Sequence, residues 1–282
     1  MSIEVTNNEQ RTLEMIESVV SFISQFDSCA VAMSAGVDSA VVAKAAFLAL
    51  DSNAIAVTAQ SPSLAAGELE QAQQLAELIG IEHQILQTSE FSNPSYIRNQ
   101  GDRCYHCKSE LYGQMDALAK SLQGQTLLNG TNTDDLGDYR PGLQAASESN
   151  VRSPLAECEI NKTGVRAVAR YWQLPIWDKP ASPCLSSRVA YGEEVTPERL
   201  QMIDQAEQYL RSQGINPVRV RYHRGDLARI EVPQQYIERI ADMQTRKSLE
   251  KYLRGLGFQF VTIDLGGFKS GSLNQLLQID TS

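Results

Sequence analysis

The chain has 282 residues, of which 42% are hydrophobic and 21% are charged, and its formal net charge is -9. This length is comfortable for two domains with separate cores, and the composition is typical of a soluble globular protein rather than a disordered chain. The acidic balance argues against the broad basic surface that supplies most non-specific nucleic-acid affinity, so we expect a small phosphorylated partner and no nucleic acid. No segment approaches the roughly 18 unbroken apolar residues of a membrane span, so no membrane association is expected.

The cysteine count and the N-terminal sequence indicate a reducing compartment. Residues 1–15 carry acidic side chains and lack the cationic and then apolar order of an export or transit signal. The cysteines are odd in number, at positions 29, 104, 107, 158 and 184. We therefore expect a cytoplasmic protein with reduced thiols rather than a disulfide framework.

The first half of the chain alternates two patterns. Apolar residues at helical spacing predict helices over 9–26, 38–50, 65–80 and about 105–122. Short apolar runs predict strands over 29–34, 53–60, 82–88 and 125–131. Strands that alternate with helices predict an α/β fold, with a parallel sheet covered by helices on both faces.

The second half changes character twice. Residues 130–192 are rich in glycine and proline and contain one clear helical pattern, over 163–174. Beyond Gly192 the patterns predict a helix, a two-stranded hairpin, a second helix and a strand, over 196–214, 217–223, 227–233, 234–257 and 258–265. This order suits a small α+β domain. We therefore expect two domains, 1–193 and 194–282.

The stretch from Ser34 to Ser39, SAGVDS, follows a buried strand and runs directly into a helix. Small residues leave backbone N–H groups free, and the helix N-terminus directs its partial positive charge to the same place, so the stretch suits an anion. Ser34 and Ser39 can add hydroxyl donors, and Asp38 can hold Mg²⁺ through its carboxylate. The alternative is an ordinary strand-to-helix junction, which also needs small residues and a polar cap.

This stretch resembles the SGGxDS loop of the PP-loop ATP pyrophosphatases, enzymes that cleave ATP between its α and β phosphates. Ala35 stands where that pattern has its first glycine, so we expect Ala35 to have a negative φ. The resemblance implies a Rossmann-like domain similar to the adenine nucleotide alpha hydrolases.

Four further segments, 130–155, 182–196, 217–233 and 257–274, are similar to the LarE family, whose members are ATP-dependent sulfur insertases of nickel-pincer nucleotide biosynthesis. The similarity covers nearly the whole chain. It implies that a carboxylate of pyridinium-3,5-biscarboxylic acid mononucleotide is adenylated with release of pyrophosphate, and that sulfur then displaces AMP to form a thiocarboxylate. Magnesium and ATP together make the carboxylate oxygen a leaving group.

The LarE resemblance implies separate groups of residues for the pyrophosphate and the adenosine of ATP. Pyrophosphate is expected at Ser34, Gly36, Asp38 and Ser39, and adenosine at the strand ends near Ala32 and Thr58. A second strand end supplies Gly130, Asp134 and Asp135, because ligands of open α/β sheets gather there; the alternative for the two aspartates is a solvent-exposed turn.

Arginines are the expected phosphate ligands of the substrate. Arg140 suits either a phosphate contact or a structural bridge. Arg219 and Arg221 are two residues apart on a predicted strand, so they leave on one face and can form a phosphate fork, unless that face is simply solvated. The LarE resemblance adds Ser187 to this phosphate site. We expect a catalytic group of Cys184, Asp38, Ser187 and Arg188.

The pair Cys104 and Cys107 has the spacing of a metal clip, a redox pair or two ordinary helix-start cysteines. LarE enzymes come in two forms. In one, a single loop cysteine gives up its sulfur; in the other, three cysteines similar to Cys104, Cys107 and Cys184 hold a 4Fe-4S cluster whose open iron accepts hydrosulfide. We favour the cluster, with sulfide or another sulfur donor as partner, and keep sacrifice of Cys184 as the alternative.

Other functions remain open at this stage. A tRNA thiolation enzyme shares the loop and the cluster chemistry, and a non-catalytic nucleotide-binding or cluster-carrying module would need the same binding residues. The LarE resemblance also implies a homo-oligomer, with a hexamer as the candidate assembly.

Overall fold

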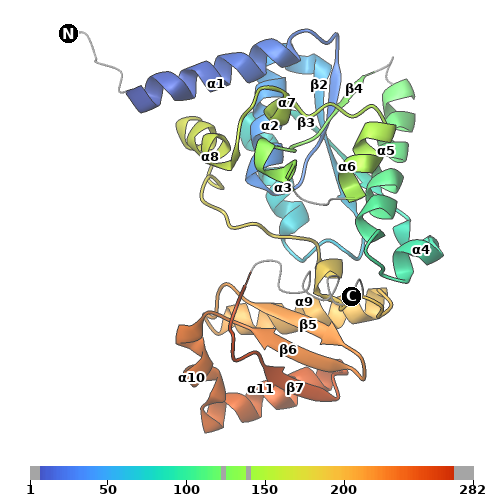
Figure 1. Cartoon of the computed structure of the whole chain (residues 1–282), viewed down its shortest axis with the longest axis vertical. Helices are drawn as coiled ribbons and strands as arrows, with labels where there is room; N and C mark the ends of the chain where they lie inside the picture. Colours follow the sequence, from blue (N-terminus) through green and yellow to red (C-terminus); the bar gives the residue numbers. More distant parts are fainter. Residues whose placement is uncertain (1–6, 122–124, 138–140, 270–282) are drawn as a thin grey trace. The chain divides into compact units, whose positions relative to one another are not determined.

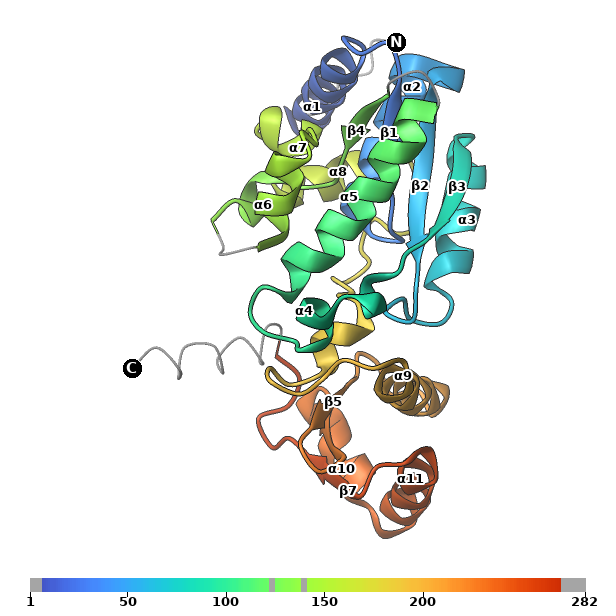
Figure 2. The ribbon, with the colours of Figure 1, turned by 90° about the vertical axis from the view of Figure 1, so that its right-hand side faces the viewer.

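The computed structural model describes residues 7–121, 125–137 and 141–269, which form two compact units (Figures 1 and 2). The first unit contains Met1–Ser61, Gly67–Ser89 and Cys104–Ser182. The second contains Pro62–Ala66, Glu90–Arg103 and Pro183–Ser282. The boundary at 193/194 stays a prediction; residues 183–193 group here with the second unit.

The first unit is built on a four-stranded sheet in the order β3-β2-β1-β4, and every neighbouring pair is parallel. The strands are β1 (Cys29–Ala32), β2 (Ala54–Gln60), β3 (Glu82–Gln87) and β4 (Thr126–Leu128). Cys29 aligns with Ala54 on one side and with Thr126 on the other. The expected parallel α/β sheet is therefore confirmed.

Helices cover both faces of this sheet (Figure 2). Successive residues of each buried strand point to opposite faces, so apolar side chains on both faces need helices to pack against. They are α1 (Asn7–Ile23), α2 (Val37–Leu50), α3 (Glu68–Ile79), α5 (Arg103–Ser121), α6 (Pro141–Glu148), α7 (Pro154–Glu157) and α8 (Lys162–Tyr171). Cys29 and Val31 pack in the core made with α1, α2, α3 and α8, whereas Ala30 packs in the core made with α5 and α6. The result is a three-layer α/β arrangement.

The segment 130–192 contains more helix than the sequence predicts. Besides α8, the structure forms α6 and α7, which begin at Pro141 and Pro154. Proline is well tolerated in the first turn of a helix, where its missing N–H has no intrahelical partner. These prolines therefore start helices instead of marking loop.

The second unit contains the short α4 (Pro94–Ile97) and a three-stranded sheet in the order β5-β6-β7. In chain order its elements are α9 (Pro197–Ser212), β5 (Arg219–His223), β6 (Leu227–Glu231), α10 (Ile237–Ala241), α11 (Met243–Leu256) and β7 (Phe260–Ile263). β5 and β6 are antiparallel, and β6 and β7 are parallel. The expected α+β order is therefore present.

One expected helix of this unit is divided. The pattern over 234–257 predicts a single helix, but the structure ends α10 at Ala241 and starts α11 at Met243. Asp242 lies between them with a non-helical ψ of 144°, and its side chain accepts hydrogen bonds from the N–H groups of Gln244 and Thr245 at 3.0 and 3.3 Å. This N-cap begins a new helix and explains the break.

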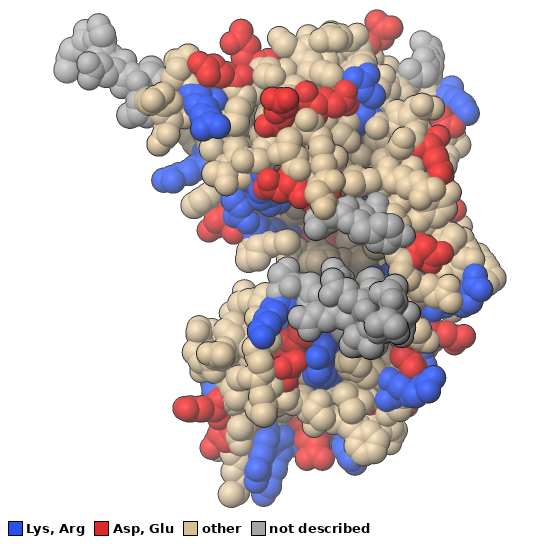
Figure 3. Space-filling view, in the orientation of Figure 1, with Lys and Arg blue, Asp and Glu red and all other residues tan. Residues whose placement is uncertain are grey.

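The surface has a mixed charge. On the face shown in Figure 3, acidic and basic side chains are interspersed over the described residues. This face therefore presents neighbouring charges of both signs instead of one continuous basic track.

Across the described ranges, no helix combines the length and the apolar character needed to cross a membrane.

Candidate active site

The loop from Ser34 to Ser39, called the PP loop below, joins β1 to α2 and closes on the hydroxyl of Ser39. The Ser34 N–H donates to Ser39 Oγ at 3.0 Å, and this Oγ lies 2.9 and 3.1 Å from the carbonyl oxygens of Ser34 and Gly36. The Gly36 N–H donates to Ser34 Oγ at 3.3 Å. Gly36 has a φ of -92°, and Ala35 is not among the described residues with positive φ, so alanine fits the loop.

The end of β4 approaches the PP loop closely. β1 lies between β2 and β4, so the carboxyl ends of β1 and β4 flank the point where the strand order reverses, and ligands of open α/β sheets bind at such points. Gly130 follows β4 and lies against the start of α2: a Cβ atom at this position would come within 2.7 Å of the Ser39 backbone nitrogen. Gly130 therefore permits the close approach of the two segments.

Asp38 is the carboxylate in the first turn of α2, where the segment after β4 approaches the PP loop. Asn132 Nδ2 donates to Asp38 Oδ1 at 3.1 Å, and Lys162 Nζ lies 2.5 Å from Asp38 Oδ2. The side chains of Asp38 and Lys162 are 23% and 31% exposed, so a ligand can reach both. Within the described part of the chain, the Lys162 ammonium has Asp38 as its single acceptor. A carboxylate beside the hydroxyl and backbone groups of the PP loop suits Mg²⁺ and phosphate together.

Asp134 and Asp135 act as local caps. Asp134 Oδ2 accepts the Lys162 N–H at 3.0 Å, and Asp135 Oδ2 accepts the Asn132 N–H at 3.1 Å. Asn132 Oδ1 in turn accepts the Asp134 N–H at 3.0 Å. The two aspartates therefore hold Asn132 and Lys162 beside Asp38. Direct binding of nucleotide by Asp134 or Asp135 stays a prediction.

Ala32 ends β1, and Thr58 lies on the neighbouring β2. Thr58 Oγ1 donates to the Met33 carbonyl oxygen at 2.8 Å, and it lies 2.8 Å from His83 Nε2. Because the hydroxyl proton of Thr58 goes to Met33, His83 must donate through Nε2. Burial lowers the pKa of His83 and favours its neutral form. These bonds tie β1, β2 and β3 together, and adenosine binding by Ala32 and Thr58 stays a prediction.

Two lysines at the PP loop escaped the sequence patterns. Lys162 and Lys179 reach partners 124 and 144 residues away, at Asp38 and at the Ala35 carbonyl oxygen. The available signal for Lys162 was its place beside the one clear helical pattern in the glycine- and proline-rich segment; nothing marked Lys179. Arg140, a predicted phosphate ligand, lies outside the described residues.

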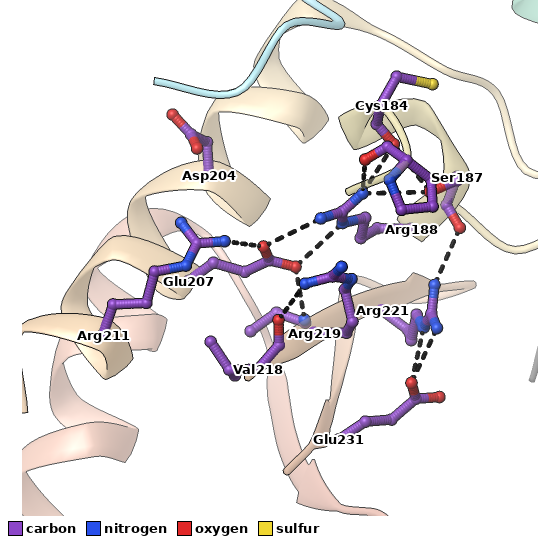
Figure 4. A network of polar contacts seen from close by, with 12 residues as sticks. Cys184, Ser187, Arg188, Asp204, Glu207, Arg211, Val218, Arg219, Arg221 and Glu231 are labelled. Carbon is purple, nitrogen blue, oxygen red and sulfur yellow. Dashed lines mark hydrogen bonds and ion pairs between the residues drawn. The ribbon is translucent and has the colours of Figure 1, made fainter. Parts of the chain in front are cut away.

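Three buried arginines of the second unit form the arginine cluster: Arg188, Arg219 and Arg221, which are 0%, 9% and 6% exposed (Figure 4). Arg188 Nε lies 3.1 Å from Glu207 Oε1, and Arg221 Nη2 lies 2.8 Å from Glu231 Oε2. Glu207 also accepts the backbone N–H of residue 220 on β5 at 3.1 Å. The carboxylates of α9 and β6 thus hold cations that would otherwise repel one another.

Arg188 also holds the loop that carries Cys184 (Figure 4). Its Nη1 donates to the carbonyl oxygens of Pro183 and Cys184, the latter at 2.9 Å, and to Ser187 Oγ at 3.2 Å. Ser187 Oγ donates to the Cys184 carbonyl oxygen at 2.7 Å. Since Nε and Nη2 of Arg188 are engaged by Glu207, these contacts support positioning by Arg188. Catalytic roles for Arg188 and Ser187 stay predictions.

The electrostatics of the arginine cluster favour an added anion. Burial, followed by the proximity of Arg188, lowers the pKa of Arg219 from 12.5 to about 10, and Glu207 opposes this only in part. A phosphate group beside Arg219 would raise its pKa again, because an opposite charge favours the charged form. It would also accept charge-assisted hydrogen bonds. The cluster therefore has the chemistry expected of a phosphate site.

The five cysteines differ in exposure: Cys29 is buried, and Cys158, like Cys107, is partly exposed. Cys104 and Cys184 are exposed, and Cys107 is partly exposed one turn after Cys104 in α5. Burial raises the pKa of Cys29 to about 12 and also raises the pKa of Cys158. Thiolates are the metal ligands, so the raised pKa values of Cys29 and Cys158 disfavour these two as ligands, and a cluster held by Cys104, Cys107 and Cys184 stays a prediction. Among the described residues, no three His, Cys, Asp or Glu side chains already stand together as a metal site.

Comparison with known proteins gives consistent matches. The NAD synthase family model matches residues 9–101, which include the PP loop. The chain is 48% identical over 262 residues to the uncharacterized protein slr1717 of Synechocystis sp., covering 93% of this chain and 97% of that protein. It is 38% identical over 261 residues to the pyridinium-3,5-bisthiocarboxylic acid mononucleotide synthase of Lactiplantibacillus plantarum, covering 92% and 94%.

The parallel sheet, the PP loop at its switch point and the NAD synthase match define an ATP-dependent enzyme of the PP-loop class. The Lactiplantibacillus relative is aligned over nearly the whole of both chains, well beyond the PP-loop region alone. The chain belongs to the LarE family, the ATP-dependent sulfur transferases, which confirms the family expected from its motifs.

Proposed function

We propose that this protein converts a carboxylate of pyridinium-3,5-biscarboxylic acid mononucleotide to a thiocarboxylate at the expense of ATP. A carboxylate oxygen attacks the α-phosphorus of ATP, and pyrophosphate leaves. The sulfur of hydrosulfide then attacks the carbonyl carbon, a C–S bond forms, and AMP leaves with the oxygen. The observation that carries the proposal is the 38% identity to the synthase over 261 residues, which are 92% of this chain and 94% of that protein.

For the first step we propose that the PP loop holds the phosphates of ATP. Backbone N–H groups at the start of α2 and the hydroxyl of Ser34 supply donors, while Asp38 supplies a ligand for Mg²⁺. Lys162, whose ammonium has one acceptor among the described residues, adds a cation for the phosphate charge. On this proposal, Mg²⁺ and Lys162 offset the negative charge that pyrophosphate carries away.

For the substrate we propose that Arg219 and Arg221 bind the phosphate of the mononucleotide, with Ser187 beside them. The lowered pKa of Arg219 supports this, because a dianion offsets the cost of burying its charge. The Ser187 carbonyl oxygen accepts a hydrogen bond from Arg221 Nη1 at 3.1 Å, which links the serine to the cluster. Arg188, whose Nη1 donates to Ser187 Oγ at 3.2 Å, positions this serine.

For the sulfur we propose a 4Fe-4S cluster held by Cys104, Cys107 and Cys184. Cys104 and Cys184 are exposed, and the raised pKa values of Cys29 and Cys158 disfavour the thiolate form of those two, which supports this choice. When bound by three thiolates, such a cluster supplies an open iron that accepts hydrosulfide. We further propose a cytoplasmic homo-oligomer, with a hexamer as the candidate assembly.

The adenylation step is tested by pyrophosphate release. Purified protein with ATP and Mg²⁺ should release pyrophosphate only when the dicarboxylate mononucleotide is added. Arg219→Gln should raise the KM for the mononucleotide about tenfold or more, the usual worth of a charged hydrogen bond, and leave the KM for ATP unchanged. Pyrophosphate release at the same rate with and without the mononucleotide would contradict the proposal.

The sulfur source is tested separately. Anaerobic protein reconstituted with iron and sulfide should show cluster absorbance that is lost in Cys104→Ser, Cys107→Ser and Cys184→Ser. Cys158→Ser is the matched control and should keep it. If no cluster forms, and the chain instead loses the elements of hydrogen sulfide at Cys184 during one turnover, the sacrificial form of the chemistry is correct.

A further inference from the structure

Lys179 makes an unusual set of contacts in the first unit. Its Nζ lies 2.9 Å from the Ala35 carbonyl oxygen, 3.0 and 3.1 Å from the two carboxylate oxygens of Glu68, and 2.5 Å from Gln71 Oε1. The lysine side chain is 18% exposed and that of Glu68 is 21% exposed. The first acceptor belongs to the PP loop, and the other two belong to α3. Lys179 therefore ties the loop to a helix of the same unit.

The backbone at Lys179 is fixed as well. Arg166 on α8 donates from Nη2 to the Lys179 carbonyl oxygen at 3.0 Å and from Nη1 to the Trp177 carbonyl oxygen at 3.1 Å. The ammonium thus extends from an anchored main chain toward the PP loop. Such double anchoring makes its position well defined, which a group needs if it is to hold another part of the site in place.

The number of acceptors separates Lys179 from Lys162. An ammonium has three N–H donors, and those of Lys179 meet three acceptor groups: the Ala35 carbonyl, the Glu68 carboxylate and the Gln71 amide oxygen. Lys162 has one acceptor among the described residues, the carboxylate of Asp38. Lys162 therefore retains donors for a ligand, whereas Lys179 would have to give up a partner to contact one.

The contact with Ala35 sets the direction of a peptide group. In a trans peptide the C=O and the following N–H point in opposite directions. With the Ala35 carbonyl oxygen held by Lys179, the Gly36 N–H points the other way, and it does so toward Ser34 Oγ, at 3.3 Å. Gly36 carries no Cβ, and its N–H bond to Ser34 Oγ is long, so the contact with Lys179 is the shorter of the two hydrogen bonds that orient this peptide.

We propose that Lys179 is a positioning residue of the PP loop, which holds the Ala35–Gly36 peptide with its carbonyl oxygen turned away from the anion site and its N–H on the side of Ser34 Oγ. This inference rests on the proposed binding of ATP phosphates by the loop. Without the ammonium, the peptide rotates, the site loses a donor, and the exposed Ala35 carbonyl oxygen repels phosphate. Lys179 acts on ATP through the loop and leaves the mononucleotide site unaffected.

The test compares KM values for ATP and for the mononucleotide. Lys179→Met should raise the KM for MgATP by about 10-fold to 100-fold, the range expected for a charged hydrogen bond, with the KM for the mononucleotide unchanged. Lys179→Arg keeps a cation able to donate to Ala35 and should recover most of the affinity. Lys44→Met is the matched control: Lys44 also donates to a carbonyl oxygen, that of Ile79, at 3.3 Å, but it lies in the middle of α2 and contacts α3 instead of the loop.

Glu68→Gln separates positioning from direct contact. If Lys179 positions the loop, weakening its anchor lowers the affinity for inorganic pyrophosphate measured by calorimetry. If Lys179 instead binds phosphate itself, freeing it from Glu68 raises that affinity, and the proposal is wrong. Equal changes in both KM values of Lys179→Met would also overturn it. Failure of the wild-type protein to bind MgATP at all would refute the proposed function instead.

Discussion

The PP loop of the first unit and the arginine cluster of the second both gather groups that attract phosphate, but they are built from different parts of the chain. The loop uses six consecutive residues, and its donors are largely backbone N–H groups and hydroxyls. The cluster uses side chains from η4 (Leu185–Arg188) and β5, held by carboxylates of α9 and β6. The loop therefore depends on local backbone geometry, and the cluster depends on buried charge pairs.

This difference predicts where substitutions act. At the PP loop, changing one charged side chain should impair catalysis and leave folding nearly unaffected, because the backbone makes the site. In the arginine cluster, removing one carboxylate should impair folding first, because it leaves buried cations without compensation. Four predictions test this contrast.

Asp38→Asn should have the largest effect. The substitution keeps the size of the side chain but removes the charge proposed to bind Mg²⁺, and metal ions supply several kcal/mol of transition-state stabilisation. Pyrophosphate release should fall at least about 100-fold. The control is Asp51→Asn at the other end of α2, which should retain full activity. Comparable rates in Asp38→Asn and the control would remove Asp38 from the proposed metal site.

Glu207→Gln should be the most destabilising change. Glu207 is fully buried and pairs with both Arg188 and Arg211, the latter at 2.5 Å. Breaking a buried pair costs about 3–5 kcal/mol, so urea unfolding should show a loss of this size. Glu198→Gln, on the exposed surface of the same helix, is the control and should change stability far less. A loss no larger than that of the control would show that the cluster does not depend on its carboxylate.

Gly130→Ala and Gly113→Ala should change the free energy of unfolding in opposite directions. A Cβ at residue 130 would meet the Ser39 backbone nitrogen at 2.7 Å, so overpacking should cost about 1–3 kcal/mol and weaken ATP binding. A Cβ at residue 113, within α5, would meet nothing within 4 Å, so alanine should stabilise by about 0.5–1 kcal/mol. Chemical unfolding measures both. If Gly130→Ala changed neither the free energy of unfolding nor ATP binding, β4 and the PP loop would not need to approach so closely.

The smallest expected effect concerns pH. Burial lowers the pKa of His83 below 6.5, so between the two values the unfolded chain binds a proton that the folded chain does not. The stability contributed by neutral His83 is therefore complete above pH 6.5 and declines as the pH falls through the folded-state pKa. His83→Gln should make the unfolding free energy depend less on pH between 7.5 and 5.5. If the pH dependence were unchanged in His83→Gln, His83 would not contribute to it. Burial also lowers the pKa of His223, which should account for the pH dependence that His83→Gln retains.

The same contrast explains what could be predicted from the sequence. The parallel sheet was predictable because each strand and helix carries its own local pattern, and the PP loop was predictable because its residues are consecutive. Lys162 and Lys179 were not, because their partners lie 124 and 144 residues away and lysine is common on surfaces. The pairing of Arg221 with Glu231 likewise becomes visible only when β5 and β6 are aligned.

Roles were harder to predict than positions. Asp134 and Asp135 lie at the expected strand end, but their carboxylates accept backbone N–H groups there. Asp242 ended a helix that apolar periodicity extends, because a side-chain cap outweighs periodicity locally. In each case short-range polar bonding, which hydrophobic patterns do not report, determined what the residue does.

The most direct test of the central claim is mass spectrometry of the product. Limiting protein is incubated anaerobically with ATP, Mg²⁺, sulfide and pyridinium-3,5-biscarboxylic acid mononucleotide, and the mass of the nucleotide is followed. The account predicts replacement of a carboxylate oxygen by sulfur with one AMP and one pyrophosphate formed for each replacement, and more than one product for each chain. A nucleotide whose mass stays unchanged while the wild-type protein binds MgATP would contradict it.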